Sequence, residues 1–154
     1  MPMQANLERL IYASRWAPGL ADHIDQIVLG ILGSSIANNR PAELTGLLVL
    51  HDGWFVQALE GRSQSIARLM DTILQDRRHT EVKIIGAGYI GARAFQDWDM
   101  VAARVGAEAD PLLTELGMIS RFNGHKLDGE SALRLLFAVG DAYRQWERSA
   151  RFIA

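Results

Sequence analysis

Two short apolar runs joined by a polar turn constrain the fold of this chain more than any other feature. Residues 44–50 (LTGLLVL) are too few for a typical helix and apolar enough for a strand buried on both faces. His51-Asp52-Gly53 then supplies turn chemistry, and residues 54–59 predict the antiparallel partner strand. Gln57 interrupts that second run, and an unsatisfied amide in a buried strand costs on the order of 1–3 kcal/mol. Gln57 therefore needs a hydrogen-bonding partner or a function.

The segments around this hairpin alternate between strand and helix patterns. Apolar residues recur at helical spacing along residues 22–38 and 63–76, and Ile31 and Ile73 lie on the two apolar stripes. Shorter apolar segments predict further strands at residues 7–14, 81–89 and 95–101. This order of strand, helix, strand, strand, helix and strand predicts a ferredoxin-like α+β sheet with both helices on one face.

The rest of the chain predicts helices for the other face of the sheet. Residues 111–119 predict a short helix and residues 131–146 a longer one. The apolar residues of the longer helix occupy more than one stripe, so we expect it to be buried on several sides, against the sheet or another subunit. We therefore expect a main domain at residues 1–101, followed at 102–154 by a helical extension that caps the sheet, mediates oligomerisation or carries output.

Composition and missing motifs exclude several classes of function. The net charge of −2 lacks the basic footprint of nucleic-acid-binding proteins, and the absence of cysteine excludes disulfides and thiolate metal sites. No run approaches the ~20 apolar residues of a membrane span and no signal peptide is evident, so we expect a cytoplasmic protein without membrane contact. Phosphate-loop, dinucleotide, zinc-protease and serine-hydrolase motifs are absent, and no two of the four histidines stand at metal-ligand spacing. We expect neither a metabolic enzyme nor a metal site.

Uncharged hydrogen-bonding residues gather near the centre of the predicted sheet. In the ferredoxin-like order the first and third strands are adjacent, so Tyr12 and Gln57 can face one another, with Asn38 and Asn39 at the end of the first helix. This set suits a planar, neutral ligand rich in heteroatoms better than a phosphate or a metal. The phenol and the amide would equally satisfy each other as buried groups without any ligand. The pattern alone leaves both interpretations open.

At these residues the chain resembles the BLUF domain, a flavin-based sensor of blue light. The resemblance covers about residues 7–101. It consists of six blocks in family order and at family spacing, which are LIYAS (10–14), SSIANN (34–39), LTGLLVL (44–50), GWFVQALEG (53–61), DRRH (76–79) and RAFQDWDM (93–100). The resemblance implies the same ferredoxin-like fold and a non-covalently bound flavin, FAD or FMN.

The resemblance also implies roles for single residues. Tyr12 would donate an electron and a proton to the photoexcited flavin, and Gln57, between that phenol and the flavin, would rotate or tautomerise to give the signalling state. Further residues would contact the flavin, namely Asn39 at its carbonyl and N3–H edge, Asn38 beside it, Ser35 close to the glutamine, Asp76 on the pyrimidine side, and Ile31 and Ile73 on the two ring faces. Trp98 and Met100 match a pair on the last strand that would carry the signal toward the tail.

Thr72 departs from the family pattern, since several members carry a basic residue four positions before the residue that matches Asp76. A threonine cannot neutralise a phosphate, which leaves FAD versus FMN open. Arg68, Arg77 or Arg78 would compensate if they reach the phosphate, but three arginines at a helix end also fit a solvated surface.

The tail after residue 101 is too short for a cyclase or phosphodiesterase domain, so we expect output through a separate protein. The resemblance suggests an EAL-type phosphodiesterase or a transcription regulator, and the apolar tail helix suggests a homo-oligomer. One alternative is a ferredoxin-like ligand-binding or interaction module without photochemistry. Another is a small enzyme resembling an acylphosphatase, with Asn39 and Arg40 on a phosphate, although a glycine-rich anion cradle is missing from the sequence.

Overall fold

The computed structural model describes residues 7–39, 41–96, 98 and 101–153 and, within them, all side chains except those of residues 32–39 and 148–153. Five strands of these residues form one sheet in the order β4-β1-β3-β2-β5. Their bounds are β1 (Leu7–Trp16), β2 (Thr45–His51), β3 (Trp54–Arg62), β4 (His79–Tyr89) and β5 (Val101–Arg104). All neighbours are antiparallel except β2 and β5, which are parallel.

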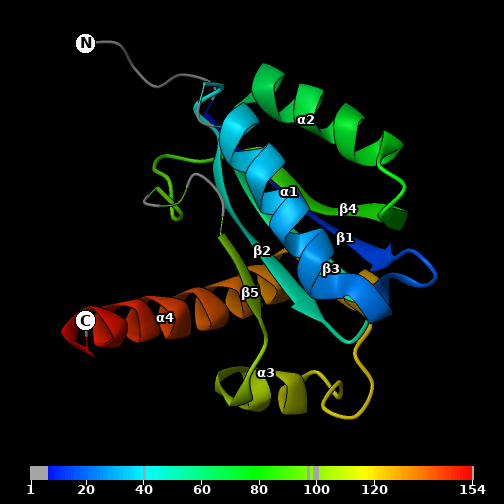
Figure 1. The fold of residues 1–154 in the computed structure, drawn as a ribbon, viewed down its shortest axis with the longest axis vertical. Helices are drawn as coiled ribbons and strands as arrows, with labels where there is room; N and C mark the ends of the chain where they lie inside the picture. The colour runs from blue at the N-terminus through cyan, green and yellow to red at the C-terminus, as the bar shows by residue number, and fades with distance from the viewer. Residues whose placement is uncertain (1–6, 40, 97, 99–100, 154) are drawn as a thin grey trace.

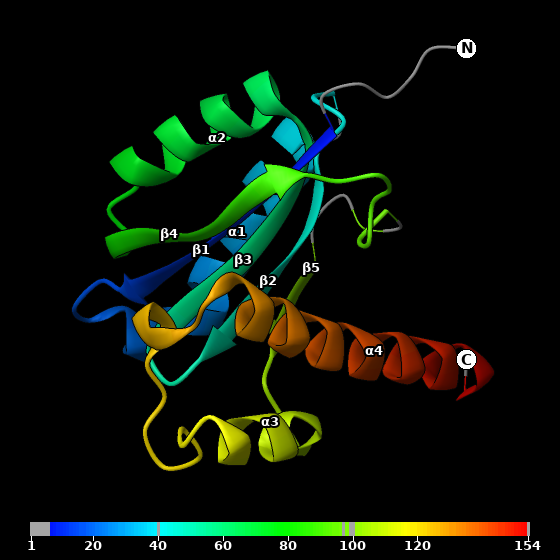
Figure 2. The same ribbon diagram turned by 180° about the vertical axis from the view of Figure 1, so that it is seen from behind.

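Helices cover both faces of this sheet. α1 (Ile24–Asn39) and α2 (Ser63–Gln75) lie side by side on one face, and α4 (Gly129–Ile153) crosses the other (Figures 1 and 2). The short α3 (Asp110–Glu115) lies near the start of α4, and single 3-10 turns occupy η1 (Leu20–His23), η2 (Ala107–Ala109) and η3 (Gly124–Lys126). The predicted ferredoxin-like order and the helical cover on the second face are therefore confirmed.

The hairpin between β2 and β3 has the predicted turn. His51 pairs with Trp54, so the loop consists of Asp52 and Gly53, whose φ angles are 51° and 84°. Two successive residues with positive φ are typical of the turn that matches the twist of a two-residue hairpin. Along the same pair of strands, a Cβ on Gly46 would lie only 2.1 Å from the Ala58 carbonyl oxygen. The two central strands thus approach closely because this position has no side chain.

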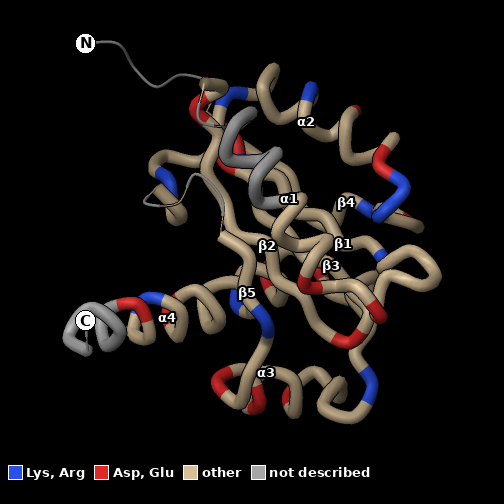
Figure 3. The backbone as a smooth tube through the Cα atoms, in the orientation of Figure 1, with Lys and Arg blue, Asp and Glu red and all other residues tan. Residues whose placement is uncertain are grey.

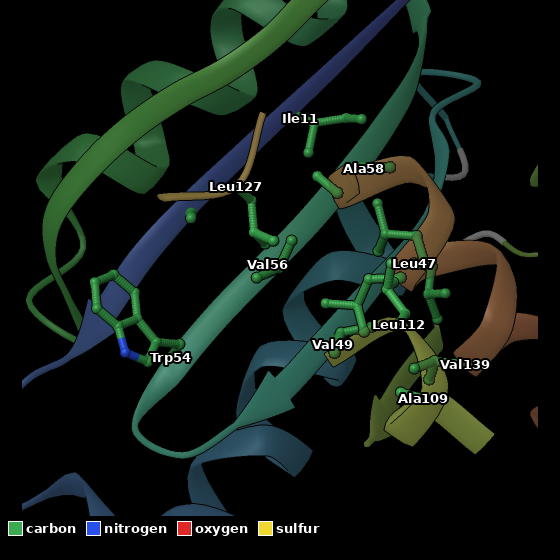
Figure 4. Packing of buried hydrophobic residues seen from close by; sticks show 14 of the residues in the cluster. Ile11, Leu47, Val49, Trp54, Val56, Ala58, Ala109, Leu112, Leu127 and Val139 are labelled. Carbon is green, nitrogen blue, oxygen red and sulfur yellow. The ribbon is translucent and has the colours of Figure 1, made fainter. Parts of the chain in front are cut away.

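Successive side chains of each strand point to opposite faces of the sheet, so the protein has two hydrophobic cores, one on each face. One cluster lies under α1 and α2 and includes Tyr12, Leu48 and Phe55. The other lies under α3 and α4 (Figure 4), where residues such as Val56 and Leu47 of the sheet meet Val139 and Leu112 of the helices. Neighbouring residues of β3 therefore face different cores.

Two predictions of local structure are wrong in detail. The last strand begins at Val101, not at Phe95. Leu74, an apolar residue of the helix predicted at 63–76, is 61% exposed and lies outside the buried stripe of α2. On α4 the buried residues lie on one face, against the sheet and α3, whereas Trp146 is 64% exposed, and burial against another subunit stays a prediction. Helical spacing predicts which residues share a stripe, but not how wide a stripe the sheet covers.

Charged residues are dispersed over the molecule. Lys and Arg are interspersed with Asp and Glu along the described chain (Figure 3), without a broad basic face. Among the described residues, no helix is long and apolar enough to cross a membrane. The same part of the chain holds no group of three or more His, Asp or Glu side chains placed to bind a metal ion.

Candidate functional site

Tyr12 and Gln57 form a buried pair at the centre of the sheet. They are direct partners in the register of β1 and β3, and both side chains belong to the face that α1 and α2 cover. The phenol donates a hydrogen bond to Gln57 Oε1, and the two residues are 0% and 4% exposed. Burial, with a smaller contribution from the negative charge of Asp76, raises the pKa of Tyr12 above its ordinary value. The phenol therefore keeps its proton and is the donor of the pair.

Two isoleucines from the covering helices lie in the apolar cluster above this pair. Ile31 of α1 is 8% exposed and Ile73 of α2 is 7% exposed, and both belong to the cluster that contains Tyr12. The polar pair thus lies on the face of the sheet where both helices contribute buried isoleucines, which are Ile24 and Ile31 of α1 and Ile66 and Ile73 of α2.

An ion pair lies just beyond the end of α2. Asp76 accepts hydrogen bonds from the Arg78 backbone N–H at 3.0 Å and from Arg78 Nε at 2.9 Å. Burial would raise the pKa of Asp76, but these hydrogen bonds and the arginine charge outweigh it and lower the pKa below its ordinary value. Arg78 Nη1 also lies 3.8 Å from the position that a Cβ would take on Gly30 of α1. The guanidinium therefore reaches from the turn before β4 toward α1, where glycine leaves room for it.

Ser14 and His79, which the sequence pattern does not identify as site residues, extend the polar set. Ser14 Oγ and His79 Nδ1 lie 2.8 Å apart, and the His79 ring centroid lies 4.6 Å from that of Phe55 and 6.0 Å from that of Tyr12. Burial lowers the pKa of His79 to about 4; the negative charge of Asp76 raises this pKa and the positive charge of Arg78 lowers it further. The imidazole is therefore neutral near pH 7. Ser14 could have been found from its spacing, since residues two apart on a strand share a face.

A β-bulge brings His79 to this place. Between the pairs Ala13–Lys83 and Arg15–Thr80 the register of β1 and β4 shifts, and Glu81 there has a φ of 53°. An extra residue bends a strand and redirects its side chains. Strand periodicity in the sequence carries no sign of such a shift.

Comparison with known proteins places this geometry in a family. A family model described as BLUF, sensors of blue-light using FAD, matches residues 7–101. The chain belongs to the BLUF family. FAD is thus the cofactor that the family uses, and sensing of blue light is its function.

Individual BLUF proteins resemble the chain over different lengths. The β subunit of photoactivated adenylate cyclase from Euglena longa is 34% identical over 74 residues, which are 47% of this chain and 9% of that protein. The photo-activated state of BlsA superposes with a TM-score of 0.79 at 26% identity, over 86% of this chain and 94% of that one. The dark state of BlrB gives a TM-score of 0.64 at 32% identity, over 75% of this chain and 86% of that one. The chain thus spans less than a tenth of the cyclase subunit but most of BlsA and BlrB.

The residues on the sheet face that α1 and α2 cover fit the flavin of a BLUF domain. A flat heteroaromatic ring needs apolar groups against its faces and hydrogen-bonding groups at its edge. The Ile31 and Ile73 side chains supply the first, and the phenol, the amide and the Arg78 guanidinium supply the second. Trp16 packs against the same cluster. Its indole Nε1, a hydrogen-bond donor, is the one buried polar atom among the described side chains that lacks a partner.

Trp98 lies on the other side of the sheet from Tyr12. It is 6% exposed and belongs to the cluster under α4, so the expectation that it stands on the last strand is wrong. Its carbonyl accepts a hydrogen bond from the Gly46 backbone N–H, and its indole packs against Arg144 of α4. Met100 and the side chains of Ser35, Asn38 and Asn39 lie outside the described residues, so their expected roles stay predictions.

Proposed function

We propose that this chain is a blue-light photoreceptor in which Tyr12 and Gln57 carry out the photochemistry of a flavin held non-covalently between α1 and α2. The observation that carries this proposal is the buried hydrogen bond between the phenol and the amide, on the face where two helices contribute apolar side chains. Ile31 and Ile73 would pack on the two faces of the ring. Asn39, Asn38, Ser35 and Asp76 would bind its edge.

The chemistry follows from the state in which the protein holds these two side chains. The bound flavin supplies light absorption and accepts an electron when excited. Tyr12 is a protonated donor, so loss of an electron from its ring leaves a strongly acidic O–H, and the proton leaves along the hydrogen bond to Gln57 Oε1. The amide would relay this proton toward the flavin and would rotate or tautomerise, which would change the hydrogen-bonding group that Gln57 presents to the site. Return of the electron and the proton to Tyr12 closes the cycle without a net product.

Output would pass from the sheet to the chain after β4 and to α4. Trp98, with Met100, is the part of this path that the sequence identifies, and Trp98 packs against residues of α4. We propose a division into a flavin-binding domain at 1–101 and a C-terminal extension at 102–154, with β5 crossing that boundary. The protein would act in the cytoplasm on a separate partner, an EAL-type phosphodiesterase or a transcription regulator, as a homo-oligomer. The likeness to BlsA over 94% of that protein, together with the family match, supports a role as a sensor.

A dark-minus-light absorbance spectrum tests this function. We expect flavin absorbance in the purified protein and a small, reversible red shift under blue light. Gln57→Leu should keep the flavin and lose the shift, because leucine has a similar size but no hydrogen-bonding group. A colourless protein that cannot be reconstituted with FAD or FMN would refute the proposal, and a normal shift in Gln57→Leu would refute the role of the glutamine. Bound flavin without any photocycle in the wild type would favour a binding module without photochemistry.

A further inference from the structure

β3 carries a buried carboxylate that the photochemistry does not use. Glu60 is 0% exposed. Its Oε2 accepts hydrogen bonds from Arg9 Nε at 2.9 Å and from the Ala94 backbone N–H at 3.0 Å, and its Oε1 accepts one from the Phe95 backbone N–H at 2.7 Å. A buried charge persists only where partners of this kind compensate its lost hydration. Glu60 therefore fixes two consecutive backbone groups, more than thirty residues away in sequence, onto β3.

The peptide group between Ala94 and Phe95 also binds α4. While its N–H donates to Glu60, its carbonyl oxygen accepts a hydrogen bond from Arg144 Nη2 at 3.3 Å. A peptide group is planar and rigid, so a displacement of its N–H is passed on to its carbonyl. One peptide group thus joins a side chain of the sheet to a side chain of α4.

The same arginine contacts the indole that follows this peptide. The guanidinium carbon of Arg144 lies 4.5 Å from the Trp98 ring centroid, and the Tyr143 ring meets the indole edge-on at a centroid distance of 5.7 Å. A Cβ on Gly140 would lie 3.2 Å from Trp98 Cη2, so the helix is in close contact with the ring. Gly46 of β2 donates its backbone N–H to the Trp98 carbonyl at 3.1 Å. Ala94 and Trp98 are therefore each held both to the sheet and to α4.

We propose that Glu60, the Ala94–Phe95 peptide group and Arg144 form a link by which β3 positions α4, and that light-induced change at Gln57 reaches α4 through this link. The light-dependent part rests on the function proposed above. Gln57 and Glu60 are three residues apart on one strand, so they face opposite sides of the sheet. A shift of β3 caused by the amide on one face moves the carboxylate on the other. Glu60 and Arg144 are positioning residues, because neither belongs to the flavin-facing set.

Hydrogen–deuterium exchange of the full chain with bound flavin, in the dark and under blue light, tests the link. In the wild type we expect light to change the exchange of amides in residues 136–147. Arg144→Ala should keep the reversible red shift and lose this light-induced change. Its dark exchange in the same residues should be about threefold to tenfold faster, because a hydrogen bond from a charged donor is lost. A full light-induced change in Arg144→Ala would overturn the proposal.

Two matched variants of α4 separate the link from general weakening of the helix. Arg134→Ala removes an arginine that pairs with Glu115 at 2.7 Å and does not bind the Ala94–Phe95 peptide group. Asp141→Asn removes the partner of Arg144 within the helix, at 3.3 Å, and leaves the contact to the Ala94 carbonyl. Both should retain the light-induced change. Its loss in Arg134→Ala to the same extent as in Arg144→Ala would overturn the link.

A dark experiment decides the positioning role independently of the photochemistry. Glu60→Gln keeps the size of the side chain but turns an NH2 group toward the Arg9 guanidinium or toward the backbone N–H groups of Ala94 and Phe95. We expect faster dark exchange in residues 136–147, although the side-chain hydrogen bonds of Glu60 go to Arg9, Ala94 and Phe95 and not to α4, while the far-UV circular dichroism stays that of the wild type. Unchanged exchange there would overturn the link. Absence of a red shift in the wild type would instead refute the proposed function, and the dark comparison would still decide whether Glu60 positions α4.

Discussion

Acidification should destabilise this protein through His79. The folded state holds the imidazole neutral, with a pKa lowered to about 4 from an ordinary value of 6.5, because the ring is buried between Tyr12 and Phe55. Between these two pH values the unfolded chain binds a proton at this residue and the folded chain does not. The free energy of unfolding therefore falls as the pH falls from 6.5 to about 4, and the contribution of His79 is fully present only above that window.

The size of the effect follows from the pKa difference. A lowering of the His79 pKa from 6.5 to about 4 contributes about 3 kcal/mol to the free energy of unfolding at high pH. About 2 kcal/mol of this contribution is lost when the pH falls from about 7 to about 5. Asp76 does not obscure this window. Its pKa is lowered, so the stability that it contributes is present above its ordinary value of 3.8 and is lost only at more acidic pH.

Urea unfolding of the wild type and of His79→Asn, in the dark at about pH 7 and about pH 5, measures this contribution. Asparagine retains a group that can hydrogen-bond to Ser14 but does not titrate. We expect the wild type to lose about 2 kcal/mol more than the variant between the two pH values. His23→Asn, at an exposed position in η1, is the control and should follow the wild type. Equal pH dependence of His79→Asn and the wild type would refute the argument, because it would show that His79 titrates alike in the folded and unfolded chains.

Two further changes test the packing around the site. Gly46→Ala should destabilise the protein by about 3 kcal/mol or more in urea unfolding, because the new Cβ would clash with the Ala58 carbonyl. Gly88→Ala is the control, because a Cβ there meets open space, and it should change stability by less than about 0.5 kcal/mol. Ile73→Ala should lower the free energy of unfolding by about 2–4 kcal/mol and should lower the ratio of flavin to protein absorbance. Leu74→Ala, on the exposed side of the same helix, should change neither quantity. Equal flavin content in the two variants would contradict a contact between Ile73 and the flavin ring.

The architecture could be predicted because its signals are local. A two-residue turn with glycine at its second position and apolar stripes at helical spacing are properties of short windows, and together they indicate the order of strands and helices. From that order the adjacency of Tyr12 and Gln57 followed, and their pairing in the structure confirms it. The roles of these residues in photochemistry stay predictions, because a hydrogen bond alone does not show electron transfer.

Long-range partners explain what the sequence could not show. Glu60 lies at the end of the predicted second hairpin strand, and only the folded chain shows that the Ala94 and Phe95 amides lie against its side chain. The same contact explains why the last strand does not begin at Phe95. The Ala94 and Phe95 amides donate to a carboxylate instead of to a neighbouring strand. His79 was missed for a similar reason, since a shift in strand register brings it to Ser14.

A carboxylate at position 60 also suits a sensor better than an apolar side chain would. Apolar packing is non-directional, so a leucine there could keep the loop near the sheet while allowing it to slide. Replacing a buried ion pair by apolar residues often leaves stability unchanged or higher, which means that the pair of Glu60 with Arg9 does not have to be retained for stability. Its two oxygens instead determine where the Ala94 and Phe95 amides lie, and directional bonds of this kind convert a small shift of β3 into a defined displacement of the peptide group. In the proposed mechanism, the alternating side chains of β3 separate two tasks, with photochemistry on the face of Gln57 and mechanical coupling on the face of Glu60.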